Sequence, residues 1–152
     1  MKFFTFLSAA LLISGSSFAT EYKIGDLKID HPFARSTHSA QTSGVVYLRI
    51  ENKGAVADKL IGASSPITKQ IEVHRMTMEG DIMRMRQEDS LTIAAKSTLN
   101  MESGKGYHLM LVGLQQQLRV GNKFPMQLQF EKAGKLDITV RVEAAKPDFH
   151  AH

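Results

Sequence analysis

Regular alternation of apolar and polar residues most strongly limits the fold of this chain. Between positions 124 and 142 every second residue is apolar on both sides of a short turn at 133–135. That pattern is typical of two strands, each with one buried face, joined as a hairpin. With the turn at 133–135, we expect Phe130 to face Ile138 and Met126 to face Val142, with Met126 in the core. The apolar positions are Phe124, Met126, Leu128, Phe130, Leu136, Ile138, Val140 and Val142.

Short strand-like segments recur through the rest of the chain. They lie at 22–29, 46–50, 59–64, 91–93, 98–99 and 107–112. Turn-forming residues separate them, and no stretch combines a helical period with capping residues. Many short strands at close intervals indicate an all-β sandwich or barrel. We expect one such domain over residues 20–145.

The first nineteen residues have the composition of a secretory signal peptide. Lys2 supplies the positive charge, residues 3–13 are apolar, and Ser17-Phe18-Ala19 fits a small-x-small cleavage site. We expect cleavage after Ala19 and export to a bacterial periplasm. The apolar run is too short to span a bilayer, so no membrane span is expected in the mature chain.

Charge and cysteine content exclude several function classes. The formal net charge is +4, and the basic residues are interspersed, so we expect no nucleic-acid binding. The sequence has no cysteine. This excludes a disulfide, a lipid-modified cysteine, a thiol nucleophile and a thiolate-ligated blue-copper centre. No nucleophile-base pair, paired-carboxylate motif or phosphate-binding loop is present, so we expect no enzyme.

Two histidines and two methionines form the strongest candidate site. His74 is followed after ten residues by Met85, and Met85 after twenty-two residues by His108, with Met110 two positions later. Thioethers bind hard cations poorly but bind Cu(I) well. The set therefore predicts a site for Cu(I), with nitrogen from the histidines and sulfur from the methionines.

A hairpin around Gly80 would bring part of this set together. If the turn is Glu79-Gly80, or the four residues Met78 to Asp81, His74 faces Met85 directly and Met76 faces Met83. One face would then carry His74, Met76, Met78, Met83 and Met85. His108 and Met110 also share a face. The alternative is that these methionines only fill the core, as methionine often does.

The same spacing resembles that of a known family, the PCuAC periplasmic copper chaperones. Their pattern is His, ten residues, Met, twenty-one residues, then His-x-Met, so the second spacer here is one residue longer, in the loop at 102–106. The resemblance extends over most of the mature chain. It includes Ala34-Arg35, Gly44 to Leu48, Asn52 to Gly54, Gly106 to Leu111 and Phe130 to Gly134.

The resemblance implies a cupredoxin-like Greek-key β-sandwich and a Cu(I) metallochaperone. It implies delivery of copper to the CuA centre in subunit II of cytochrome c oxidase, alongside a Sco-type thiol protein. We expect Met76, Met78, Met83 and Met101 to form an apolar rim or to act as transient ligands. Two rival functions are a copper-sequestering protein without a dedicated acceptor and an Ig-like protein-binding module with no metal.

The short tail from Lys146 contains two further histidines. His150 and His152, beside Asp148, could bind a second ion, Cu(II), weakly. The alternative is a flexible terminus with two incidental histidines.

Overall fold

The computed structural model describes residues 20–102 and 106–144, and within these ranges it contains strands and no helix. The strands are β1 (Glu21–Ile24), β2 (Leu27–Arg35), β3 (Ser43–Asn52), β4 (Asp58–Ser64), β5 (Thr68–Glu79), β6 (Ile82–Glu88), β7 (Leu91–Ile93), β8 (Ser97–Asn100), β9 (Gly106–Leu114), β10 (Lys123–Phe130) and β11 (Gly134–Glu143). The predicted signal peptide and the tail from Lys146 lie outside the described residues. No helix in the described part has the length and apolar character needed to cross a bilayer.

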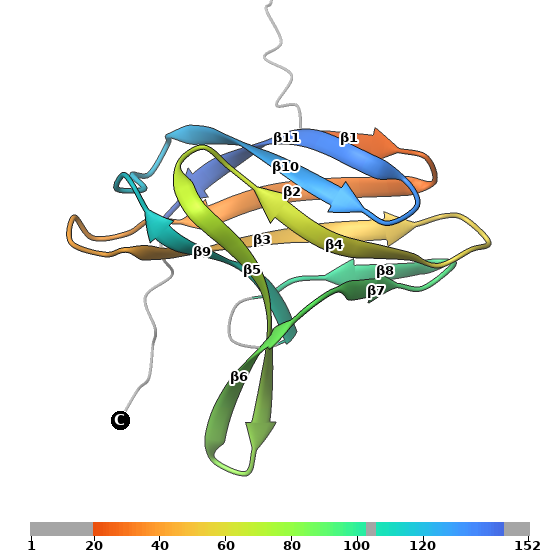
Figure 1. Cartoon of the computed structure of the whole chain (residues 1–152), viewed down its shortest axis with the longest axis horizontal. Coiled ribbons are helices and arrows are strands. Elements are labelled where there is room, and N and C mark those ends of the chain that lie inside the picture. The colour runs from red at the N-terminus through yellow and green to blue at the C-terminus, as the bar shows by residue number, and fades with distance from the viewer. Residues whose placement is uncertain (1–19, 103–105, 145–152) are drawn as a thin grey trace, which may run out of the picture.

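The strands form one continuous sheet that folds over onto itself (Figure 1). Its order is β6-β5-β9-β3-β2-β11-β10-β4-β7, with β1 added to β2 and β8 added to β3. The described pairs are antiparallel, apart from the parallel pair of β11 with β2. Several neighbours, such as β5 with β9 and β9 with β3, are not consecutive in the chain. Long crossovers of this kind are the mark of a Greek key, so the predicted all-β Greek-key sandwich is confirmed.

The core lies between the two halves of the folded sheet, and alternation decides which residues enter it. On β10, Phe124, Met126, Leu128 and Phe130 are at most 3% exposed. On β11, Ile138, Val140 and Val142 are equally buried, whereas Leu136 at the start of the strand is only partly buried against the core. The predicted core position of Met126 is confirmed.

The register of this β10–β11 hairpin differs from the prediction. Met126 faces Ile138 and Phe130 faces Gly134, so the turn is 131–133. A buried carboxylate explains the difference. The Asp58 oxygens accept hydrogen bonds from the backbone N–H groups of Lys132 and Ala133, at 2.9 and 3.0 Å. The turn is therefore fixed by a residue far away in the chain.

The β5–β6 hairpin extends beyond the sandwich (Figure 1). The pairing of β5 with β9 ends where Met76 meets Gly106, whereas β5 continues to Glu79. Beyond Met76, the partner of β5 is β6, the edge strand that begins the sheet order. The candidate metal ligands lie where this two-stranded ribbon leaves the sandwich.

Candidate metal centre

The two candidate histidines lie side by side. The antiparallel register of β5 with β9 places His74 directly opposite His108. Their ring centroids are 5.4 Å apart, with planes tilted by 52°. His108 is 2% exposed and the side chain of His74 is 13% exposed. Two imidazoles thus meet in a part of the sheet that is almost closed to water.

A carboxylate orients His74. Glu72 precedes it by two residues on the same face of β5, and Nε2 of His74 lies 2.7 Å from Oε2 of Glu72. The carboxylate can only accept, so Nε2 carries the hydrogen and donates it. In the neutral ring, Nδ1 then keeps its lone pair. Nδ1 is buried and has no hydrogen-bond partner. Carboxylates commonly hold metal-binding histidines in this way.

His108 also presents an unpartnered nitrogen. Its Nε2 is buried without a hydrogen-bond partner. The ring of Tyr47, on β3, packs at 6.3 Å between centroids. Burial, and then the charge of His74, lower the pKa of His108 to about 4. His108 is therefore neutral at pH 7, the state in which an imidazole binds a metal.

Two unpartnered nitrogens in one cross-strand row are costly for a folded protein. A buried polar atom without a partner costs about 1–3 kcal/mol. A metal ion bound between the rings would satisfy both atoms at once. The chemistry of this row therefore fits a metal that accepts nitrogen ligands.

Met110 lies one row from the histidine pair. It follows His108 by two residues on β9, and its cross-strand neighbours are Glu72 on β5 and Val45 on β3. It is partly buried. Diagonal neighbours of this kind have Cα atoms roughly 7–8 Å apart, within reach of a long side chain. The thioether of Met110 can therefore approach the row of His74 and His108.

Met85 lies on the predicted face but not at the predicted position. His74 faces Gln87, whereas Met85 faces Met76. The expected direct pairing of His74 with Met85 is therefore wrong. The two-residue turn is Gly80-Asp81, with Gly80 at a φ of 63°, a conformation that glycine adopts easily. The register consequently moves by two residues.

Because side chains alternate with a period of two, this shift leaves the faces unchanged. The expected common face of His74, Met76, Met78, Met83 and Met85 is thus confirmed by the register. Met85 is diagonal to His74, on the side of the histidine row opposite to Met110.

The hairpin methionines are not core residues. Met78, Met83 and Met85 are 58%, 53% and 49% exposed. The alternative in which these side chains only fill the core is therefore wrong. Met101, by contrast, is 4% exposed and belongs to the core cluster, so it is not part of the exposed methionine face of the hairpin.

Methionine thioethers add to the donors available around this row. Among the described residues, no group of three or more His, Cys, Asp or Glu side chains is arranged to hold a metal. Two imidazoles supplemented by thioethers form a donor set that suits Cu(I). Glu72 and Met76 share the face and were not among the predicted ligands. They lie two residues before and two residues after His74 on β5, and this spacing is the sequence signal that places them on its face.

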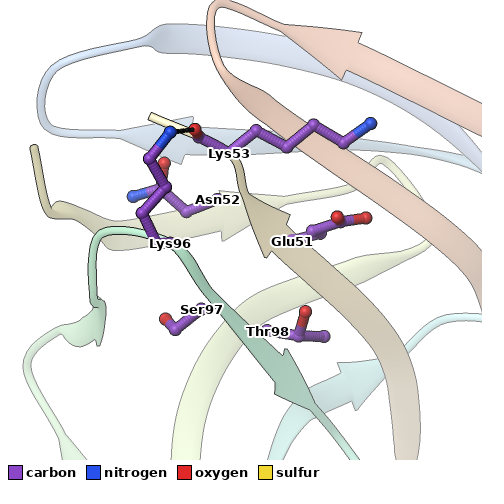
Figure 2. Close-up of a pocket in the computed structure, with 6 residues that line it drawn as sticks. All are labelled: Glu51, Asn52, Lys53, Lys96, Ser97 and Thr98. Carbon is purple, nitrogen blue, oxygen red and sulfur yellow. Dashed lines mark hydrogen bonds between the residues drawn. The ribbon is translucent and has the colours of Figure 1, made fainter. Parts of the chain in front are cut away.

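An open pocket of about 330 Å³ lies elsewhere, on β3 and β8. Its lining residues are Glu51, Asn52, Lys53, Lys96, Ser97 and Thr98 (Figure 2). Lys96 donates a hydrogen bond to the carbonyl of Lys53 at 2.7 Å. The buried amide of Asn52 donates to the carbonyls of Val56 and Ile93. These groups tie the loops together, which is a structural role.

Comparison with known proteins supports the family suggested by the spacing. A protein-family model described as putative lipoprotein LpqE-like matches residues 27–142. The putative lipoprotein Lxx21020 of Leifsonia xyli subsp. xyli is 28% identical over 95 residues. The match covers 62% of this chain and 57% of that protein, so the chain spans a little over half of the relative's length.

Solved structures of PCuAC domains have the same fold. The copper-bound PCuAC domain from PmoF2 matches with a TM-score of 0.73 and 31% identity, over 83% of this chain and 99% of that domain. The solution structure of the Cu(I) form of DR1885 from Deinococcus radiodurans matches with a TM-score of 0.63 and 22% identity, over 86% and 83% of the two chains. At that identity the second match shows the fold alone. The cupredoxin-like sandwich is thus confirmed, and the chain belongs to the LpqE-like family and to the PCuAC domains.

Proposed function

We propose that this protein is an exported metallochaperone that carries Cu(I), bound by His74, His108, Met85 and Met110. The observation that carries the proposal is the cross-strand pair of His74 and His108. Each ring has a buried nitrogen without a hydrogen-bond partner. Thioethers lie in the adjacent rows on the same face. The copper bound to the PCuAC domain of PmoF2 supports the choice of metal.

Each of the four residues would bind the ion through a particular atom. His74 would bind through Nδ1, because Nε2 is committed to Glu72. His108 would bind through Nε2, the nitrogen that lacks a partner. Met85 and Met110 would add sulfur, which favours the monovalent ion and cannot form a disulfide in an oxidising compartment. The exposed position of Met85 leaves one side of the site open for release.

We further propose the setting in which the protein works. The chain is exported to the periplasm after cleavage following Ala19 and delivers copper to the CuA centre in subunit II of cytochrome c oxidase, beside a Sco-type thiol protein. It performs no catalysis. A second, weaker Cu(II) site at His150 and His152 is part of this proposal. Support for these points comes from the sequence of the first nineteen residues, the composition of the tail and the family to which the chain belongs.

The decisive experiment is an anaerobic titration of residues 20–152 with Cu(I) against a competing chelator. X-ray absorption should show nitrogen and sulfur neighbours around one tightly bound ion. Failure to bind Cu(I) would reject the proposal and favour an Ig-like protein-binding module.

The proposed acceptor needs a separate experiment. The copper-loaded protein is mixed with a soluble CuA fragment of subunit II, with and without a reduced Sco-type protein. Appearance of the CuA absorption is the expected result. Tight binding without transfer would favour a copper-sequestering protein.

A further inference from the structure

The tip of the β5–β6 hairpin carries thioethers that the proposed site does not use. Met78 faces Met83 directly across the two strands, and Met76 faces Met85 in the preceding row. All four side chains lie on the face that carries His74. Met78 and Met83 are both more than half exposed.

Packing does not account for methionine at these positions. Strands favour β-branched and aromatic residues, and an exposed strand favours polar ones. The opposite face of the same hairpin is mostly polar, with Ile82 beside the turn as its exposed apolar residue. There Arg84 contacts Glu79 at 2.6 Å and Arg75 contacts Glu88 at 3.8 Å. Only one face of the exposed ribbon therefore carries methionines, and it is the face continuous with the histidine pair.

We propose that Met78 and Met83, with Met76 as a third sulfur, form a second Cu(I) site that is weaker and open to solvent. This inference rests on the proposed function, because it makes the hairpin tip the place where copper enters and leaves the site at His74 and His108. The ligand class is a soft monovalent cation, Cu(I) or its mimic Ag(I), bound only by thioethers.

The spacing of the rows supports a stepwise path. Residues two apart on a strand are separated by roughly 6.6 Å. The rows follow each other as Met78 with Met83, Met76 with Met85, and then His74. On the other side of β5, Met76 faces Gly106, which has no side chain to block that row. In each step one copper–ligand bond forms as another breaks. The ion keeps its charge, so no electron or proton is needed.

The test begins with a variant that lacks the inner site. His74→Ala with His108→Ala should still bind one Ag(I), weaker than the wild-type inner site by about tenfold or more. X-ray absorption should show sulfur neighbours only. Adding Met78→Leu and Met83→Leu should abolish this binding. The matched control is Thr77→Ser with Arg84→Lys, a directly opposed pair on the other face of the same hairpin, which should change nothing.

A second measurement uses a protein with an intact inner site. In the wild type, methyl NMR signals of Met78 and Met83 should shift with the second equivalent of Ag(I). Met78→Leu with Met83→Leu should keep the inner affinity yet slow the transfer of Cu(I) to a chelator. Equal transfer rates, or no shift of these signals, would overturn the proposal.

The outcomes separate this inference from the proposed function. If the histidine variant binds no Ag(I), or if removing the tip methionines leaves its residual binding intact, the tip site does not exist. If the histidine variant binds Cu(I) as tightly as the wild type, the proposed inner site is wrong instead.

Discussion

Nε2 of His74 donates a hydrogen bond to Oε2 of Glu72 at 2.7 Å, and this contact decides which nitrogen of His74 remains available. The carboxylate is only partly exposed, with 20% of its side chain accessible. The contact thus links two residues of one strand into a single unit, in which Glu72 acts as a positioning residue.

We therefore expect Glu72→Ala to weaken Cu(I) binding by roughly 10–100-fold, because the imidazole loses the group that fixes its orientation. Glu72→Gln keeps an acceptor for Nε2 and should restore most of the affinity. Chelator competition measures both affinities. Nitrogen NMR of His74 should show the Nε2-protonated form in the wild type and a mixture in Glu72→Ala. Unchanged affinity and tautomer in Glu72→Ala would show that the contact has no positioning role.

The histidines themselves give a second prediction. His74→Ala and His108→Ala should each lower the Cu(I) affinity by at least about a hundredfold, about 2.7 kcal/mol, because each removes a nitrogen ligand. Met126→Leu, in the core, and His38→Ala, on the exposed surface, are the controls and should leave the affinity unchanged. The same titration, with circular dichroism to check folding, measures all four. Similar affinities across the set would exclude the histidine row as the site.

The low pKa of His108 predicts how the metal-free protein responds to acid. Between pH 6.5 and about 4 the unfolded chain binds a proton at His108 and the folded chain does not. The contribution of His108 to the free energy of unfolding is thus complete above pH 6.5 and is lost as the pH falls toward 4. It amounts to a few kcal/mol, on the order of 1.4 kcal/mol for each pKa unit.

Urea unfolding of the metal-free protein at pH 7 and pH 4.5 checks this expectation. His108→Leu should show a smaller loss of stability between the two pH values than the wild type does. His38→Leu, at an exposed position, is the control and should behave like the wild type. The same pH dependence in wild type and His108→Leu would contradict the prediction.

Metal selectivity tests whether the thioethers of Met85 and Met110 are ligands. Two thioethers add little affinity for Cu(II) but suit Cu(I), so the wild type should prefer Cu(I) and Ag(I) over Zn(II) and Cu(II). Replacing Met85 and Met110 together by histidine should reduce that preference. Competition titrations with each ion, in wild type and double variant, give the comparison. A wild-type preference for zinc, or unchanged selectivity in the double variant, would mean that the methionines are not ligands.

The sequence predicted which face of a strand each residue occupies better than it predicted the pairing register of the strands. Alternation placed Met126 in the core and gave His74 and Met85 a common face, and both predictions are confirmed. Both hairpin registers were wrong, by two residues at the Gly80 turn and by four at the turn after Phe130. Even shifts preserve the faces, so the hydrophobic pattern cannot distinguish these registers.

The contact between His74 and His108 could not be predicted from the local sequence pattern. His74 and His108 meet because β5 pairs with β9, although β6, β7 and β8 separate these strands in the chain. Such a pairing follows from the whole topology rather than from the residues around either histidine. Residue type and spacing brought His108 into the predicted set, in agreement with the resemblance to a family, but they did not predict that His108 faces His74.

The start of β9 at Gly106 divides the candidate site into two parts of unequal stiffness. His74 and His108 belong to strands that are hydrogen-bonded within the sandwich. Met85 lies on the edge strand β6 in the row where the pairing of β5 with β9 ends, and beyond that row only the two strands of the hairpin remain, a unit that is only marginally stable by itself. Bending or fraying of that ribbon requires far less free energy than opening the core. If copper is bound as proposed, the hairpin can withdraw the Met85 sulfur from the ion while the nitrogen pair stays in place, so that tight holding and ready release are governed by separate parts of the same sheet.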